Sequence, residues 1–419
     1  MSSIIVLLIQ FIYMNIMRTM GNNDRPPFLI AICIFSFVIA FYNDLSHSVY
    51  LWSLKTPIMA GLFWRIFLLY FDTYGHSVFV LPNSGADSAM FYNYAVSIAE
   101  GGSRTRTFFP VVMGHIFRWI GPSMMYGQFL LVICSMISIC VLARILFYFD
   151  IQEQVRELTI WLIGLLPNYA ILSALFVREA IVCMFLTISL YFYIRWFKDG
   201  RIRWMLIAFA GVGIASVFHS GAAGMALGYI LILLLYDSRK GNIQLRFANI
   251  VFAIIISIVI AYLYVNFGDV LFSKMQGVDS IEDIANTNES GGSSYAAYVG
   301  NSNSIVNMVI YTPIRMIYFL FSPFPWQWRG IRDIIAFMFS SLFYIISVVN
   351  AVQYVLREND EKKNAILTTL IIAVAITFVF AWGTSNTGTA SRHREKMVCI
   401  YGLLFALSYR GRLPVRNIG

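Results

Sequence analysis

The chain has 419 residues, of which 59% are hydrophobic and only 12% are charged. With a mean hydropathy of +0.72, this composition excludes a soluble globular protein and predicts a polytopic membrane protein. The net charge of +9 does not indicate nucleic-acid binding, because most Lys and Arg residues fall in short loops between apolar runs, where they set the orientation of the spans.

Apolar runs of spanning length predict an all-α bundle of about twelve transmembrane helices in a single integral membrane domain, 1–419. The runs are 4–19, 27–42, 56–72, 123–147, 157–175, 179–197, 203–219, 221–236, 247–267, 334–356, 364–382 and 396–410. The first has no basic region before it and no small-residue cleavage site after it, so we interpret it as a span and not as a signal peptide. The five cysteines lie within apolar runs and are interpreted as small buried hydrophobic residues without a disulfide framework.

Lys and Arg residues in short loops predict the orientation. Basic groups occur around 195–203, 237–246, 357–363 and 410–416, which the positive-inside bias places in the cytoplasm together with both termini. The segments that then lie outside are 73–122, 175–178, 219–221, 268–333 and 383–395. The number of membrane crossings agrees with this orientation only if the further apolar run 304–322 does not cross the membrane. We therefore predict a re-entrant or interfacial helix there. Irregular backbone at that depth is tolerated where it lines a protein-enclosed cavity.

The two long outer loops, 73–122 and 268–333, form the predicted active-site face. Within the first, residues 86–99 place apolar side chains near one helical face, which predicts a short interfacial helix. Asp87 begins this helix, and two interpretations stay open for it. It is an N-cap, or it is a carboxylate held at the membrane surface as a general base.

Polar residues at the outer ends of three spans are further candidates. Arg178 and Glu179 are adjacent and do not share a helix face; they anchor the span at the interface, or Arg178 points inward to an anionic group. His219 and His393 are candidate bases, although a lone His is more often a satisfied polar residue. No spacing of ligands predicts a metal, and no cofactor is expected.

A cluster of cationic and aromatic residues follows the second outer loop. It contains Arg315, Trp326, Arg329 and Arg332, with prolines among them that break the helix. Guanidinium groups match phosphate oxygens, and tryptophan faces stack on sugars or cations. The alternative is an aromatic belt with snorkelling arginines.

The triplet Arg392-His393-Arg394 is basic although it is predicted to lie outside. It is interpreted as a diphosphate clamp, with headgroup binding as the alternative. We predict that Arg178, Arg315, Arg392 and Arg394 converge on one outward-facing cavity. The Gly-rich segment 291–295, which ends in Tyr295, lacks the lysine of a nucleotide P-loop and is interpreted as a mobile loop that covers the substrate.

Several of these motifs occur together and in order. They are Leu81-Pro82-Asn83-Ser84-Gly85-Ala86-Asp87, Leu175-Phe176-Val177-Arg178-Glu179, Gly291-Gly292-Ser293-Ser294-Tyr295, Phe321-Ser322-Pro323-Phe324-Pro325-Trp326 and Arg392-His393-Arg394. As an ordered set, from about residue 60 to 405, the chain resembles the polytopic polymerases and GT-C-like membrane glycosyltransferases of bacterial exopolysaccharide, capsule and O-antigen clusters. It lacks the paired acidic motif that many GT-C enzymes carry after their first span.

The resemblance implies transfer of a saccharide from a polyprenyl-diphosphate carrier to an acceptor at the outer face of the cytoplasmic membrane. The expected partners are that lipid-linked saccharide, membrane lipid, and a flippase and a chain-length regulator of the same pathway. A transporter or flippase is the alternative, but such proteins carry charged or broken spans near the midplane. A membrane O-acyltransferase is a third interpretation, for which His219 has no identifiable acidic partner in the sequence.

Overall fold

The computed structural model describes residues 1–19, 27–102, 107–237, 242–243, 251, 255, 295 and 305–411. Within these residues the secondary structure is helical, apart from a two-residue antiparallel pair in which Tyr236 is opposite Ile243. The predicted all-α class is confirmed for this part of the chain. The predicted span 247–267 lies outside the described residues, except for two isolated positions, as does most of 268–304.

The helices follow one another in this order: α1 (Ser2–Thr19), α2 (Pro27–Ser46), α3 (Lys55–Tyr74), α4 (Ala86–Ala99), α5 (Phe108–Ile120), α6 (Met124–Tyr148), α7 (Glu153–Leu165), α8 (Pro167–Ala174), α9 (Glu179–Asp199), α10 (Ile202–Phe218), α11 (Gly224–Leu235), α15 (Ile305–Phe321), α16 (Ile331–Ile335), α17 (Leu342–Arg357), α18 (Glu361–Trp382), α19 (Thr387–Arg394) and α20 (Val398–Ser408). Short helical turns are η1 (Trp52–Leu54), η2 (Ser220–Ala223), η3 (Pro325–Gln327), η4 (Ala336–Ser341) and η5 (Glu395–Met397), and the strands are β1 (Tyr236–Asp237) and β2 (Asn242–Ile243).

Six helices in the described part are long and apolar enough to cross a membrane, or seven if the bent pair α7 and α8 forms one span. Pro167, which begins α8, explains the 54° bend, because proline cannot continue the hydrogen-bond ladder of α7. The helices α1, α5, α10, η2 with α11, and α15 are apolar but shorter. The protein is therefore a multi-pass membrane protein, while the prediction of about twelve spans is not confirmed.

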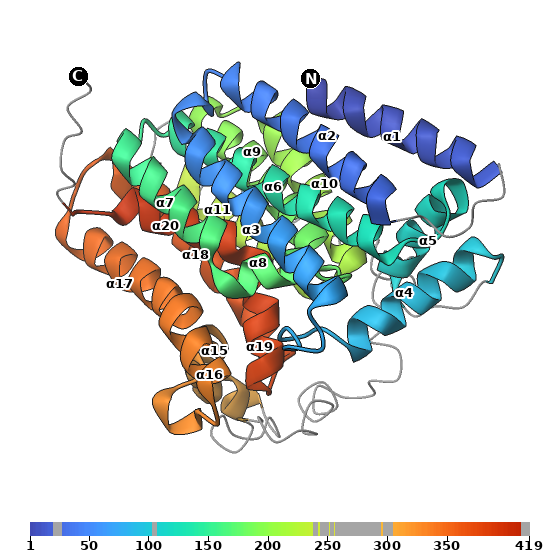
Figure 1. The fold of residues 1–419 in the computed structure, drawn as a ribbon. Helices are drawn as coiled ribbons and strands as arrows, with labels where there is room; N and C mark the ends of the chain where they lie inside the picture. Colours follow the sequence, from blue (N-terminus) through green and yellow to red (C-terminus); the bar gives the residue numbers. More distant parts are fainter. Residues whose placement is uncertain are drawn as a thin grey trace.

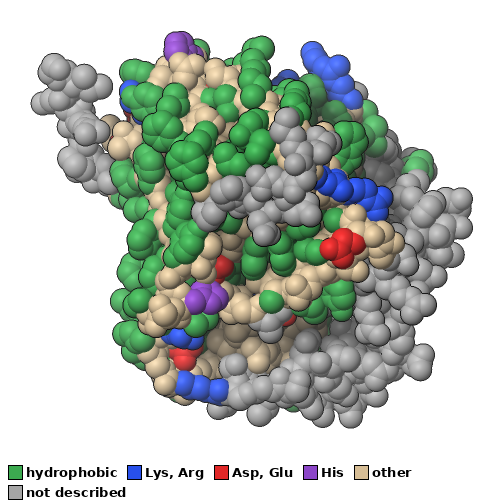
Figure 2. Space-filling view, turned by 45° about the vertical axis from the view of Figure 1, so that its right-hand side comes forward, with side chains coloured by type: hydrophobic (Ala, Val, Ile, Leu, Met, Phe, Trp, Pro, Cys, Tyr) green, Lys and Arg blue, Asp and Glu red, His purple; other side chains and the backbone are tan. Residues whose placement is uncertain are grey.

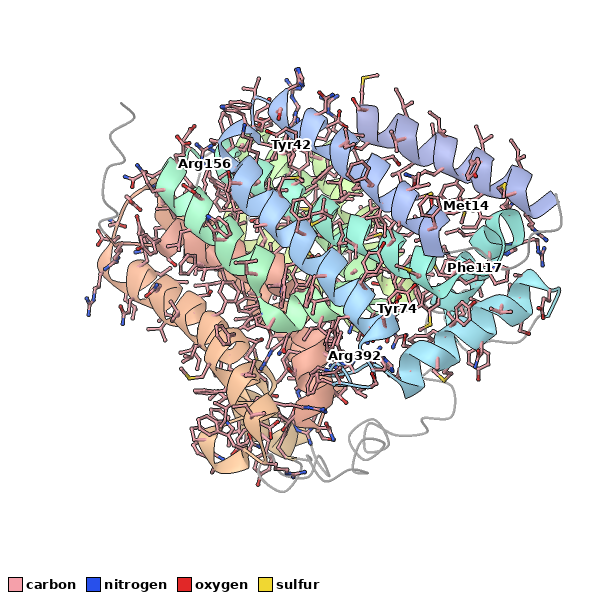
Figure 3. The ribbon with its side chains drawn as sticks, viewed as in Figure 1. Met14, Tyr42, Tyr74, Phe117, Arg156 and Arg392 are labelled. Carbon is pink, nitrogen blue, oxygen red and sulfur yellow. The ribbon has the colours of Figure 1, made fainter. Side chains whose placement is uncertain are left out.

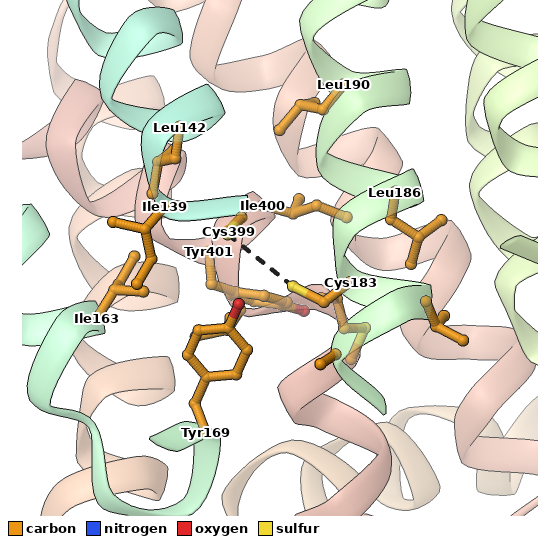
Figure 4. Close-up of a cluster of buried hydrophobic side chains, with 14 of the residues drawn as sticks. Ile139, Leu142, Ile163, Tyr169, Cys183, Leu186, Leu190, Cys399, Ile400 and Tyr401 are labelled. Carbon is orange, nitrogen blue, oxygen red and sulfur yellow. Dashed lines mark hydrogen bonds between the residues drawn. The ribbon is translucent and has the colours of Figure 1, made fainter. Parts of the chain in front are cut away.

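The helices form a bundle whose centre is built by α6, α9 and α20 (Figure 1). Figure 4 shows Cys183 of α9 facing Cys399 of α20, with 4.0 Å between their Sγ atoms, beside the ring of Tyr169. All five cysteines are free thiols. On the face drawn in Figure 2, hydrophobic side chains cover much of the described surface with scattered charges among them, as expected for a lipid-facing surface.

The two ends of the bundle differ in what they carry. Figure 1 places the start of α1 at one end of the bundle, and Figure 3 shows Arg156 and Tyr42 there. Figure 3 shows Tyr74, which ends α3, and Arg392 together at the opposite end. The described parts of the segments predicted to lie outside thus meet at one end, although the orientation in the membrane stays a prediction.

A π-helical turn interrupts the helix that runs from α16 to α17. The stretch Ala336–Ser341 has π geometry within one continuous apolar helix, Ile331–Arg357. Such turns accommodate one extra residue and are frequent at functional sites. This one buries Ser340 and Ser341, and the Ser341 hydroxyl donates to the Ser322 carbonyl at 3.0 Å, which ties the helix to the residue after α15.

Candidate functional site

Four charged side chains from separate elements form a chain of ion pairs around Arg392, which Figure 3 labels. Arg392 of α19 donates from Nη1 to Asp87 of α4 and from Nε to Oε1 of Glu179 of α9, the latter at 2.5 Å. Lys396 of η5 donates from Nζ to the same oxygen of Glu179 at 3.2 Å. We call Asp87, Arg392, Glu179 and Lys396 the charge chain. It joins residues that are 305 positions apart in the sequence.

The charge chain runs from solvent into the protein. The side chain of Asp87 is 51% exposed, that of Arg392 is 13% exposed, and those of Glu179 and Lys396 are buried. Burial alone would lower the pKa of Arg392, but the carboxylates of Glu179 and Asp87 outweigh it and raise that pKa. A guanidinium that is held between two carboxylates and stays charged can orient an anionic ligand at the open end.

The local sequence explains how α4, α9 and α19 begin, and these helices carry Asp87, Glu179 and Arg392. Gly85, at φ 121°, is the N-cap of α4, and no side chain caps this helix. The interpretation of Asp87 as the N-cap is therefore wrong; Asp87 lies in the first turn, where its charge is favourable to the helix dipole. Glu179 occupies the first turn of α9 in the same way. The Asn386 side chain caps α19 by accepting from Gly388 N at 2.8 Å.

Arg178 lies beside the charge chain and is almost wholly buried. Its Nη1 donates to the carbonyl oxygen of Phe218 at 3.3 Å, and its guanidinium lies 5.8 Å from the ring centre of Phe91. Its Nε has no hydrogen-bond partner among the described residues. A buried donor without a partner is costly, so Arg178 has capacity for an additional acceptor.

His219 and His393 form a second arrangement between α10 and α19. Their Nε2 atoms are 3.3 Å apart, and Thr384 Oγ1 lies 3.3 Å from His393 Nδ1. The backbone N–H of Gly221 donates to His219 Nδ1 at 3.2 Å. This bond assigns the proton of a neutral His219 to Nε2, which then donates to His393, and His393 donates from Nδ1 to Thr384. The two histidines could pass a proton along this line.

Arg394 is bonded to main-chain carbonyls and a serine, which are contacts that stabilise the fold. It is fully buried and donates from Nη1 to the carbonyl oxygens of Leu320 at 3.0 Å and Ser322 at 2.5 Å, and from Nε to Ser340 Oγ at 3.1 Å. Ser340 in turn donates to Glu395 Oε1 at 2.6 Å. Most donors of Arg394 therefore serve the end of α15 and the π-helical turn.

Arg315 and Tyr295 lie in the same neighbourhood as Arg394. The guanidinium of Arg315 is 4.4 Å from the ring centre of Trp382, at the end of α18. Tyr295 is buried, and it donates from N to Ser385 O at 2.8 Å and from its hydroxyl to Thr384 O at 3.1 Å. The other residues of the Gly-rich segment, 291–294, lie outside the described residues.

The remaining predicted site residues form an exposed rim. Trp326 is exposed and stacks on Phe324 with 4.6 Å between ring centres. Arg329 is exposed, and its backbone N donates to Asp333 Oδ2 at 2.8 Å. Arg332 is exposed as well, and its Nη2 lies 3.4 Å from Val80 O in the first outer loop. The rim thus joins the two outer loops.

The structure separates the four arginines predicted to converge into two groups. Arg178 and Arg392 lie together at the charge chain. Arg315 and Arg394 lie near Tyr295. Burial raises the pKa of the Tyr295 hydroxyl, and both guanidinium groups act in the opposite direction. Arg392 has two acidic partners, Asp87 and Glu179.

Sequence reasoning missed two charged residues at this end. Lys396 follows the basic triplet and begins a predicted span, so it was counted as part of that span. Asp72 ends the predicted span 56–72, and it is buried. The signal for both is the cost of a charge within or next to an apolar run. No group of three or more His, Cys, Asp or Glu residues that could hold a metal occurs in the described part.

Residues 111–265 match a family described as dolichyl-phosphate-mannose-protein mannosyltransferase. The match begins in α5 and extends beyond α11, so it includes Arg178, Glu179 and His219. It supports a polytopic membrane glycosyltransferase of the GT-C type, with a lipid-linked partner in the membrane. No curated protein and no solved structure matches the chain.

Proposed function

We propose that this protein is a membrane glycosyltransferase that extends a surface polysaccharide on a polyprenyl-diphosphate carrier, at the outer face of the cytoplasmic membrane. The observation that carries the proposal is the charge chain. It places a partly exposed carboxylate, Asp87, against an arginine at the end of the bundle where the predicted outer segments meet. The match over 111–265 supports the glycosyltransferase class.

In this mechanism the acceptor hydroxyl attacks the anomeric carbon of the lipid-linked sugar. The bond from the acceptor oxygen to that carbon forms, and the bond from the carbon to the phosphate oxygen breaks. Asp87 accepts the hydroxyl proton, and the carrier phosphate leaves with the electron pair. Arg392 and the unused donor of Arg178 stabilise the charge that develops on this leaving group.

A monophosphate carrier is the second candidate. The name of the matched family refers to a dolichyl phosphate.

The substitution Asp87→Asn tests the proposal. Because Gly85 and not Asp87 caps α4, the helix should persist, and protein abundance should stay near normal. We expect transfer to fall by about a hundredfold or more, the usual order for loss of a general base. Surface polysaccharide should disappear and lipid-linked precursor should accumulate at the outer face.

The location of that precursor separates the hypotheses. Accumulation in the inner leaflet would indicate a flippase, because a blocked flippase leaves its substrate inside. Full-length polysaccharide in the Asp87→Asn strain would overturn the role of Asp87 and make His219 or His393 the candidate base.

The proposed orientation has its own test. A cysteine introduced at Gln327 in η3 should react with a membrane-impermeant maleimide added to intact cells. Labelling of that cysteine only after the membrane is opened would contradict the external location of this segment and the predicted cytoplasmic termini.

A further inference from the structure

Asp72, in the last turn of α3, is a buried carboxylate with partners on three other parts of the chain. Gln128 of α6 donates from Nε2 to its Oδ2 at 2.7 Å, and Ser84 donates its hydroxyl to Oδ1 at 2.6 Å. His76 lies with Nε2 at 3.2 Å from the same Oδ1 and at 3.1 Å from Ser84 Oγ. Asp72 therefore ties α6 and α3 to the loop that precedes α4.

The loop before α4 combines two residues of positive φ with one internal backbone bond, from Ser84 N to Leu81 O at 3.0 Å. Asn83 and Gly85 both have positive φ, at 66° and 121°, and Asn83 adopts a conformation that is rare for a residue with a side chain. A Cβ at Gly85 would meet nothing within 4 Å, so no packing holds the turn at that point. Ser84 lies between these two residues and is the one that bonds to Asp72. The chain reaches Asp87 three residues later.

The position of Asp72 is unfavourable for α3 itself. A carboxylate at the C-terminal end of a helix opposes the helix dipole, and a buried charge needs compensating hydrogen bonds. The favourable interactions of Asp72 are the bonds to Ser84, Gln128 and His76. The bond to Gln128 fixes Asp72 against α6, and the bonds to Ser84 and His76 hold the loop.

We propose that Asp72 is a positioning residue which, through Ser84, holds the turn that places Asp87 beside Arg392. Asp72, Ser84 and Gln128 together form the loop anchor. This inference rests on the proposed function, in which Asp87 is the base. Asp72 itself does not meet the substrate, because it is buried and both of its carboxylate oxygens accept hydrogen bonds.

The first measurement is hydrogen–deuterium exchange of the full-length protein in lipid nanodiscs, without any added substrate. In Asp72→Asn the Gln128 side chain can turn its amide oxygen toward the new NH₂, so the bonds to Gln128 and Ser84 persist but lose the charge that strengthens them. Peptides that cover 81–92 should then exchange about tenfold faster, the equivalent of one hydrogen bond to a charged group. Peptides from the middle of α6 should not change.

Matched variants show whether the loop anchor causes the effect. Ser84→Ala should speed exchange in 81–92, and Ser84→Thr, which keeps the hydroxyl, should not. Thr73→Ala is the control, because the Thr73 hydroxyl donates to Leu69 O within α3. Combining Asp72→Asn with Gln128→Glu reverses donor and acceptor and should restore slow exchange.

The amount of polysaccharide made by the same variants completes the test. We expect about a tenfold loss in Asp72→Asn and recovery in the double variant, in step with exchange. Unchanged exchange in 81–92 on Asp72→Asn and Ser84→Ala would overturn the loop anchor. Faster exchange, with polysaccharide unaffected even by Asp87→Asn, would leave the loop anchor in place and overturn the proposed function instead.

Discussion

Arg392 and Arg394 are two residues apart in the same short helix, yet they lie in two different environments. Arg392 bonds to carboxylates from α4 and α9, and the chain of charges to which it belongs opens to solvent at Asp87. Arg394 is fully buried and donates mainly to backbone carbonyls and to Ser340. The residue type and the helix are the same, so the partners distinguish the two roles.

The comparison shows what makes an arginine available to a ligand. A partner that is itself charged and partly exposed, as Asp87 is, can rearrange around an anion, because water replaces the bond that is given up. Water cannot replace the bonds to main-chain carbonyls in a buried site, so removing a donor there leaves the carbonyls without a hydrogen bond. We therefore expect substitutions of Arg392 to affect transfer and substitutions of Arg394 to affect folding.

Arg392→Lys should cause the largest change. Lysine keeps the charge but cannot bond to Asp87 and Glu179 simultaneously through the two sides of a planar fork. We expect transfer per folded molecule to fall by about a hundredfold, with abundance near that of the wild type, since removing one charge-stabilising donor from a site has effects of this order. Polysaccharide formation normalised to protein abundance is the measurement. A transfer rate close to wild type would show that the two-carboxylate arrangement is not required.

Arg394→Lys should mainly reduce stability. The substituted side chain cannot reach Leu320, Ser322 and Ser340 together, so buried acceptors lose their donors. We expect the free energy of unfolding to fall by about 2–4 kcal/mol, and abundance to fall with it. Thermal unfolding in detergent measures the first, and quantitative immunoblotting of membranes measures the second. If Arg394→Lys left stability unchanged and abolished transfer, Arg394 would have a role in transfer and would not differ from Arg392 in the way proposed.

Glu395→Gln should have the smallest effect, and one that depends on pH. Burial raises the pKa of Glu395 to about 7, although Arg394 and Ser340 act in the opposite direction. Because the folded value exceeds the ordinary value of 4.5, this contribution to stability is complete below the ordinary value and is lost as pH rises through about 7. Glutamine cannot ionise.

The Glu395→Gln variant should therefore not show this loss of stability as the pH rises. Between about pH 5 and about pH 8, the wild type should lose about 2–3 kcal/mol of stability relative to Glu395→Gln. Parallel thermal unfolding at both pH values tests it, with Thr73→Ala as a control that keeps the wild-type pH dependence. Identical pH profiles for the wild type and Glu395→Gln would show that Glu395 does not titrate in this range.

The long spans could be predicted from the sequence because apolar length is a local property. The predicted run 123–147 corresponds to α6, and the run 179–197 begins at the first residue of α9. The run 157–175 was predicted as one span, and the bend at Pro167 divides it. Proline within an apolar run is compatible with a kink or with a break, and the packing around it decides between them.

Three of the four members of the charge chain were predictable, but Lys396 and the connections between the members were not. Asp87, Glu179 and Arg392 were candidates because a charge beside an apolar run is costly. Their mutual ion pairs depend on how α4, α9 and α19 pack, which no local pattern specifies. The same applies to Arg394, whose main-chain acceptors belong to distant residues, and to Asp72, whose partner Gln128 lies within a span.

The π-helical turn at Ala336–Ser341 makes the helix sensitive to its length as well as to its side chains. Deleting one residue from this turn would convert it to a regular α-helix. Because the turn takes up the extra residue, the parts of the helix on either side of it would keep their relative orientation. The change would fall on Ser340 and Ser341, which bond to Glu395 and to the Ser322 carbonyl. A one-residue deletion would thus separate the end of α15 from this helix while the rest of the helix stayed in register.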